Sequence, residues 1–173
     1  NLMTSGHGIA HTEVSTPDTT VLHGVQLWVA LPAESANTAR DFAHYAPPAI
    51  TVGDVTALIF LGTLLGSTSP VETFTPLLGA ELRIPPGADV TLDVDPGFEH
   101  GFLVDSGRVE IVDSTTGPLE RTELGYVGVG AETVVLANRG DDDARVIVLG
   151  GAPFDDDIIM WWNFVGRTHE EIV

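Results

Sequence analysis

The feature that most constrains this chain is a long series of short apolar stretches, each closed by glycine or proline. Turn sequences such as Pro85-Pro86-Gly87, Asp95-Pro96-Gly97 and Asn138-Arg139-Gly140 separate them. Short strands with frequent turns are typical of antiparallel sandwiches and barrels, because parallel strands need long crossover connections. The sequence therefore predicts an all-β barrel. The predicted strands are 50–52, 55–60, 71–77, 80–84, 89–94, 102–104, 108–112, 125–129, 133–137 and 145–149.

The two ends of the chain follow other patterns. Residues 22–31 alternate, with Val25, Leu27 and Val29 on one face, which predicts a further strand that stops at Pro32. Pro47-Pro48 closes a polar stretch and marks a linker. Residues 158–165, IIMWWNFV, predict an apolar strand, too apolar for an exposed tail. We expect one of its adjacent tryptophans to pack in a core and the other between domains.

Composition excludes several classes of partner. The chain has 25 acidic residues against seven basic ones, all arginine, and a formal charge of −18. A binder of nucleic acid or of an anionic membrane needs a basic face, which this chain cannot easily build. Cysteine is absent, so disulfides and thiolate metal sites are excluded. Because the chain has no apolar run of about 18 residues, we expect a cytoplasmic protein.

The pair His11-x-Glu13 is the clearest candidate for chemistry. In an extended strand the two side chains project from the same face, and an imidazole with a carboxylate suits a divalent ion such as iron, manganese or zinc. A metal centre needs three or four protein ligands, and His7 would lie about 13 Å from His11 along a strand. From these residues alone, an ordinary surface or hydrogen-bonded pair is the other interpretation.

Several longer motifs resemble the pirin family. Residues 3–13 (MTSGHGIAHTE) resemble the pirin pattern MTAGxGIxHSE, and residues 22–32 (LHGVQLWVALP) resemble its xxGxQLWVNLP. The stretches 69–78, 150–154, 159–165 and 168–172 resemble the second domain and the close of bacterial pirin-like proteins. The motifs occur in the family's order along essentially the whole chain.

The resemblance implies a bicupin, two small jelly-roll barrels of which the first carries one divalent metal, usually iron. The family's ligands are an upstream H-x-H pair and a downstream H-x-E pair, which His11 and Glu13 match. The upstream pair has no counterpart here, so we expect a fragment that lacks the start of the first barrel. The expected domains are 1–48, the remainder of the metal-binding barrel with the linker; 49–154, the C-terminal barrel; and 155–173, a strand and helix start at the domain junction.

The second barrel offers a weaker candidate. Aligned on Gly107, Asp93 and Asp95 fall near the cupin H-x-H positions and Glu99 near an acidic position, with His100 one residue out of phase. The two aspartates could take a hard cation, but a structural cupin without metal is the favoured interpretation.

Two functions follow from the resemblance. The first is a quercetin (flavonol) 2,3-dioxygenase, in which dioxygen opens the heterocycle with loss of carbon monoxide and Glu13 ligates the metal and takes the hydroxyl proton. The second is a metal-dependent regulator that acts through protein partners. The −18 charge suits a partner with a basic patch.

Overall fold

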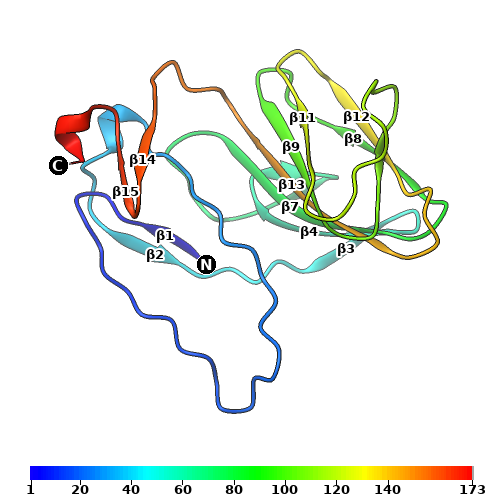
Figure 1. The fold of residues 1–173 in the computed structure, drawn as a ribbon, viewed down its shortest axis with the longest axis horizontal. Helices are drawn as coiled ribbons and strands as arrows, with labels where there is room; N and C mark the ends of the chain where they lie inside the picture. The colour runs from blue at the N-terminus through cyan, green and yellow to red at the C-terminus, as the bar shows by residue number, and fades with distance from the viewer. Residues whose placement is uncertain (173) are drawn as a thin grey trace. The chain divides into compact units, whose positions relative to one another are not determined.

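The computed structural model describes residues 1–172, which form two compact units. One unit is His44–Pro153, and the other combines Asn1–Ala43 with the C-terminal segment that begins at Phe154. Figure 1 shows the strands of the unit His44–Pro153 arranged as a barrel. Within residues 1–172 the helical elements are two short 3-10 turns, so the predicted all-β class is confirmed.

The unit His44–Pro153 is built from two antiparallel sheets. The larger sheet contains, in spatial order, β11 (Leu124–Val127), β9 (Glu99–Ser106), β13 (Ala144–Gly151), β7 (Leu77–Ile84), β4 (Val55–Leu61) and β3 (Ala49–Val52). The smaller sheet contains β10 (Glu110–Ile111), β12 (Thr133–Ala137) and β8 (Asp89–Asp93). A short hairpin joins β5 (Thr63–Leu64) to β6 (Ser67–Thr68).

Strand alternation places the core between these sheets. Along β9, His100, Phe102 and Val104 are buried while the residues between them are partly exposed. Period-two burial arises because successive side chains in a strand point to opposite faces. The largest apolar members of the buried cluster are Phe102, Ile59, Leu82, Ile84, Leu92 and Leu136.

The strand predicted at residues 71–77 is wrong. This stretch is a loop, and only Leu77 belongs to a strand, as the first residue of β7. Ser69 initiates the loop, since its hydroxyl donates to the Phe60 carbonyl at 2.8 Å and accepts the Val71 N–H at 3.2 Å. Such local hydroxyl bonds give the backbone partners other than a neighbouring strand.

The second unit has little regular structure. Its strands form two antiparallel pairs, and Figure 1 shows the long connection that follows the first strand. The pairs are β1 (Leu2–Thr4) with β2 (Asp41–Ala43) and β14 (Ile159–Trp161) with β15 (Phe164–Gly166); the 3-10 turns are η1 (Ala33–Ser35) and η2 (His169–Glu171).

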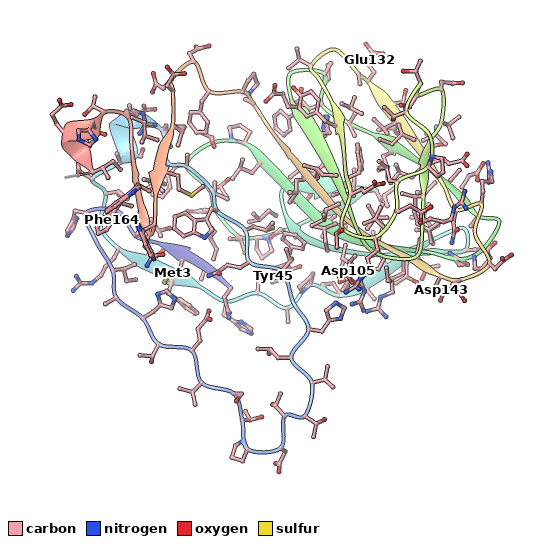
Figure 2. All side chains as sticks on the ribbon, viewed as in Figure 1. Met3, Tyr45, Asp105, Glu132, Asp143 and Phe164 are labelled. Carbon is pink, nitrogen blue, oxygen red and sulfur yellow. The ribbon has the colours of Figure 1, made fainter. Side chains whose placement is uncertain are left out.

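The strand predicted at residues 22–31 is also wrong. No strand is formed there, and Val25, Leu27 and Val29 are all exposed. Figure 2 shows the side chains on the long connection between β1 and β2, of which this segment is the later part. Alternation makes a segment suitable for a sheet, but a strand forms only where a second strand supplies hydrogen-bond partners. Among residues 1–172, no strand pairs with this segment.

Residues 158–165 form a hairpin instead of the single predicted strand. The chain reverses at Trp162, whose φ is +52°, so Trp161 and Phe164 lie opposite each other with ring centroids 6.5 Å apart. The exposed fractions of Trp161 and Trp162 are 57% and 78%. The expectation that one indole is buried is therefore wrong for the described chain.

Candidate functional site

His11 and Glu13 follow an anchored turn near the start of the chain. Within that turn, the backbone N–H and the ring Nδ1 of His7 both bond to the Thr38 carbonyl, at 3.2 and 2.9 Å. Gly6 adopts φ +51°, and a Cβ there would lie 2.0 Å from the same carbonyl oxygen. The turn therefore requires glycine, and His7 has a structural partner of its own.

The candidate metal ligands do not form a metal centre within the described chain. His11 and Glu13 are exposed and lie outside any strand, so the expected common strand face is absent. Among residues 1–172, no three His, Asp or Glu side chains gather closely enough to hold an ion. The donor types suit a divalent metal, but their arrangement here does not, and these residues alone cannot hold one.

Arg167 ties the C-terminal segment to the end of residues 22–31. Its Nη2 donates to the Leu31 carbonyl at 2.6 Å, and its Nε donates to Asp156 at 2.8 Å. The backbone N–H of Arg167 donates to the Glu171 carboxylate at 2.6 Å. The charge-assisted bond from the Arg167 guanidinium therefore holds the C-terminal end of the irregular stretch 22–31 in place.

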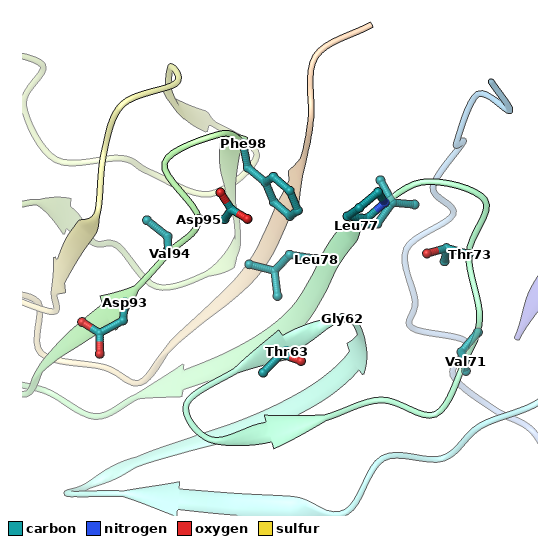
Figure 3. A pocket seen from close by; sticks show the side chains of 11 residues that line it. Gly62, Thr63, Val71, Thr73, Leu77, Leu78, Asp93, Val94, Asp95 and Phe98 are labelled. Atoms are coloured by element: carbon teal, nitrogen blue, oxygen red, sulfur yellow. The ribbon is translucent and has the colours of Figure 1, made fainter. Parts of the chain in front are cut away.

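A cavity of about 390 Å³ opens at the mouth of the His44–Pro153 barrel. Figure 3 shows Asp95, Phe98 and Leu78 around its upper part and Thr73 on the opposite wall. The lining is Gly62, Thr63, Val71, Thr73, Pro76, Leu77, Leu78, Asp93, Val94, Asp95 and Phe98. Asp93 and Asp95, the possible cation ligands of the second barrel, thus both reach the mouth, but Asp93 points away from Asp95 in Figure 3.

His100 lies inside the barrel beside this cavity. The residue is 1% exposed, and neither ring nitrogen has a hydrogen-bond partner. Sequence alignment placed His100 out of phase with the cupin positions, so its burial was missed. The alternation of His100 with Phe102 and Val104 in β9 is the signal that could have revealed it.

Glu99, the neighbouring acid, projects to the other face of β9. Its carboxylate accepts a 2.5 Å hydrogen bond from the Tyr126 hydroxyl on β11. This bond raises the pKa of Tyr126, because deprotonation would place two negative charges side by side. The Glu99 carboxylate therefore has its hydrogen-bond partner on the outer face of the barrel.

Burial of His100 predicts a loss of stability in mild acid. Desolvation lowers the pKa of His100, and the Asp95 charge opposes the shift only in part. Below the ordinary histidine pKa of about 6.5, the unfolded chain binds a proton that the folded chain excludes. The free energy of unfolding should therefore decrease as pH falls from about 7, by up to about 1.4 kcal/mol per pH unit, until the folded-state pKa is reached.

Hydrogen exchange of the β9 and β13 amides in the full-length protein measures this effect, after correction for the intrinsic pH dependence of exchange. His100→Leu should remove the slope between pH 7 and 5.5, whereas the exposed control His169→Gln should keep it. An unchanged slope in His100→Leu would assign the acid sensitivity to other groups.

Comparisons with known proteins cover nearly the whole chain. A curated protein of Pseudomonas aeruginosa named "Putative quercetin 2,3-dioxygenase" is 43% identical over 99% of this chain and 53% of its own length. Human pirin is 28% identical over 98% of this chain and 59% of its own length. This chain thus spans about half the length of the curated relatives that it matches.

The structural comparison agrees with the sequence comparison. A crystal structure of a quercetin 2,3-dioxygenase from Acinetobacter baumannii matches with a TM-score of 0.86 and 33% identity, over 98% of this chain and 56% of that one. Within residues 1–172, no helix is both long and apolar enough to cross a bilayer. The family model for the pirin C-terminal cupin domain matches residues 79–173, more than half of the chain. The chain therefore belongs to the pirin family of cupin proteins.

Proposed function

We propose that this chain is part of a cytoplasmic, metal-dependent flavonol 2,3-dioxygenase with quercetin-like substrates. The similarity to the Pseudomonas and Acinetobacter proteins supports this activity, because it extends over 98–99% of the chain and so includes the segment of His11 and Glu13. In the proposal, His11 and Glu13 supply two ligands of one divalent metal, with iron as the first choice. Two further histidines come from a part of the protein outside this chain.

The need for outside ligands follows from the geometry of the described chain. An exposed imidazole and an exposed carboxylate two residues apart cannot by themselves satisfy a metal that takes three or four protein ligands. A second sign of an outside part is the stretch 22–31, which has the pattern of a strand but pairs with no strand among residues 1–172. In the proposal, residues 1–48 complete a first barrel with that outside part.

Glu13 has a proposed chemical role besides ligation. An ionised carboxylate within hydrogen-bond reach of the flavonol 3-hydroxyl can accept its proton, which yields the more electron-rich flavonolate. Flavonolate and dioxygen then give the opened ester and carbon monoxide.

Quercetin turnover by the full-length, iron-loaded protein tests the proposed activity. We expect quercetin loss, dioxygen uptake and carbon monoxide release in equal amounts, with all three abolished when a chelator removes the metal. The matched control is the same protein with the metal restored after chelation. A metal-replete protein that leaves quercetin unchanged would contradict the dioxygenase assignment and direct attention to a regulatory role.

A further inference from the structure

The hairpin of β14 and β15 is apolar and exposed on both of its faces. Each apolar side chain of residues 158–165 is at least 37% exposed, and successive side chains of a strand point to opposite faces. A two-stranded hairpin by itself is only marginally stable in water, and no third strand among residues 1–172 pairs with this one. Continuous apolar runs are typical of strands that are covered on both faces. The hairpin therefore needs a covering surface.

The residue at the tip of the hairpin indicates the same need. Trp161 pairs with Phe164, so the turn consists of Trp162 and Asn163. Trp162 has a φ of +52° at the first central position of this turn, where glycine is favoured because a side chain is strained there. A strained residue persists where the surrounding structure holds it, and such residues are frequent at functional positions. We therefore expect the exposed Trp162 indole to have a partner beyond the described residues.

The rest of the same unit also lacks a core. Apart from Pro32, the buried apolar side chains among residues 1–172 all lie in His44–Pro153. The unit that contains the hairpin exposes large apolar residues instead, Leu22 and Trp28 among them. Exposed apolar surface of this extent marks an interface. Because Arg167 donates to the Leu31 carbonyl, the hairpin is held to the end of the exposed stretch, and one covering surface can serve both.

Charge and chain length decide which occupant fits this surface. Residues 158–165 carry no charge, but three aspartates, 155–157, come directly before them. These carboxylates disfavour an anionic bilayer, and a second copy would bring the same carboxylates and the same net charge of −18. The chain spans about half the length of its curated relatives, so a further part of the same polypeptide is at hand. A covalent connection gives that part a high effective concentration.

We propose that the β14–β15 hairpin is an internal docking element, whose aromatic tip packs against the part of the same polypeptide that lies outside this chain. The C-terminal segment and residues 1–48 then share one core with that part. The inference rests on the outside part that the proposed function also invokes, but it requires neither the metal nor quercetin turnover.

Hydroxyl-radical footprinting of the full-length protein, resolved by residue with mass spectrometry, tests this packing. A docked aromatic anchor excludes water, so Trp161 and Trp162 should be oxidised at least about tenfold more slowly in the folded protein than in urea. Tyr126, an exposed aromatic residue of the barrel, is the reference for an accessible ring. A smaller protection of the tryptophans would overturn the proposal. Protection that disappears on dilution would assign the contact to a second copy and would equally overturn it.

Trp162→Gly gives opposite results for a docked and an uncovered indole. Glycine relieves the positive φ, so exchange of the β14 and β15 amides in an uncovered hairpin should stay the same or become slower. Loss of a docked indole should instead accelerate this exchange at least about tenfold in the full-length protein. A smaller acceleration, or slower exchange, would contradict docking.

Thr122→Gly is the matched control for this change of backbone. Thr122 is exposed in a turn of the barrel at a φ of +73°, and no partner is proposed for it. Its replacement should therefore leave exchange of the nearby β11 amides unchanged or slower.

Footprinting also distinguishes this inference from the proposed function, because it reads neither metal nor turnover. Protected tryptophans in a full-length protein that leaves quercetin unchanged would keep the docking element and contradict the dioxygenase. Reactive tryptophans in a protein that converts quercetin would contradict the docking element alone.

Discussion

Replacing His11 with alanine in the full-length protein should abolish the proposed metal binding and the proposed turnover of quercetin together. Loss of a residue that only orients a metal ligand already costs about 10- to 100-fold in affinity or activity. Loss of a ligand itself should therefore lower quercetin turnover by more than about 100-fold at a fixed iron concentration. Iron content by elemental analysis and carbon monoxide release measure the two effects separately.

Glu13→Gln distinguishes the ligand role of Glu13 from its role as proton acceptor. Glutamine keeps the shape of the side chain but removes its charge and its basicity, so bound iron and turnover should both fall. If excess iron restores full occupancy, turnover should stay low, because the amide still cannot accept the proton. Full recovery of turnover at full occupancy would limit Glu13 to metal binding.

His23→Ala is the matched control for both variants. His23 lies in the same irregular part of the chain and is exposed, as His11 is. Its replacement should leave iron content and turnover unchanged. Unchanged metal and unchanged turnover in His11→Ala and Glu13→Gln would refute the proposed ligands.

The barrel was predictable from the sequence because its strands find their partners inside the chain. Residues 55–60, 89–94, 133–137 and 145–149 were predicted as strands, and β4, β8, β12 and β13 cover most of each. Every one pairs with another strand of His44–Pro153. Local alternation and long-range pairing therefore favour the same structure.

The candidate metal site was less predictable, because a local sequence pattern does not show whether a second strand and further metal ligands are present beside it. Val25, Leu27 and Val29 share one face of residues 22–31, yet no strand among residues 1–172 pairs with this segment. His11 and Glu13 likewise lack both a strand and a third ligand. The spacing of the pair alone favours an ordinary surface or hydrogen-bonded pair, and it is the family resemblance that implies a metal site there.

Asn138 lies in a predicted turn, but its side chain has a structural role that the turn sequence does not indicate. Asn138-Arg139-Gly140 was predicted as a turn, and it does separate β12 from β13, but Asn138 is completely buried. Its Nδ2 donates to the carbonyls of Ile84 and Asp142, both at 2.8 Å, and its Oδ1 accepts the Gly140 N–H at 2.9 Å. The side chain thereby joins the end of β7 to the turn before β13.

Asn138→Ala should destabilise the barrel by about 3 kcal/mol, because it removes three hydrogen bonds made by a completely buried side chain, one of them in a buried place and two in partly buried ones. Exchange of the β12 and β13 amides in the full-length protein should then accelerate more than about 100-fold, since each 1.4 kcal/mol corresponds to a factor of ten. Asn37→Ala, which removes an exposed amide, should leave these rates unchanged. Exchange in Asn138→Ala within about threefold of wild type would mean that water replaces the lost amide, and that the barrel does not depend on this residue.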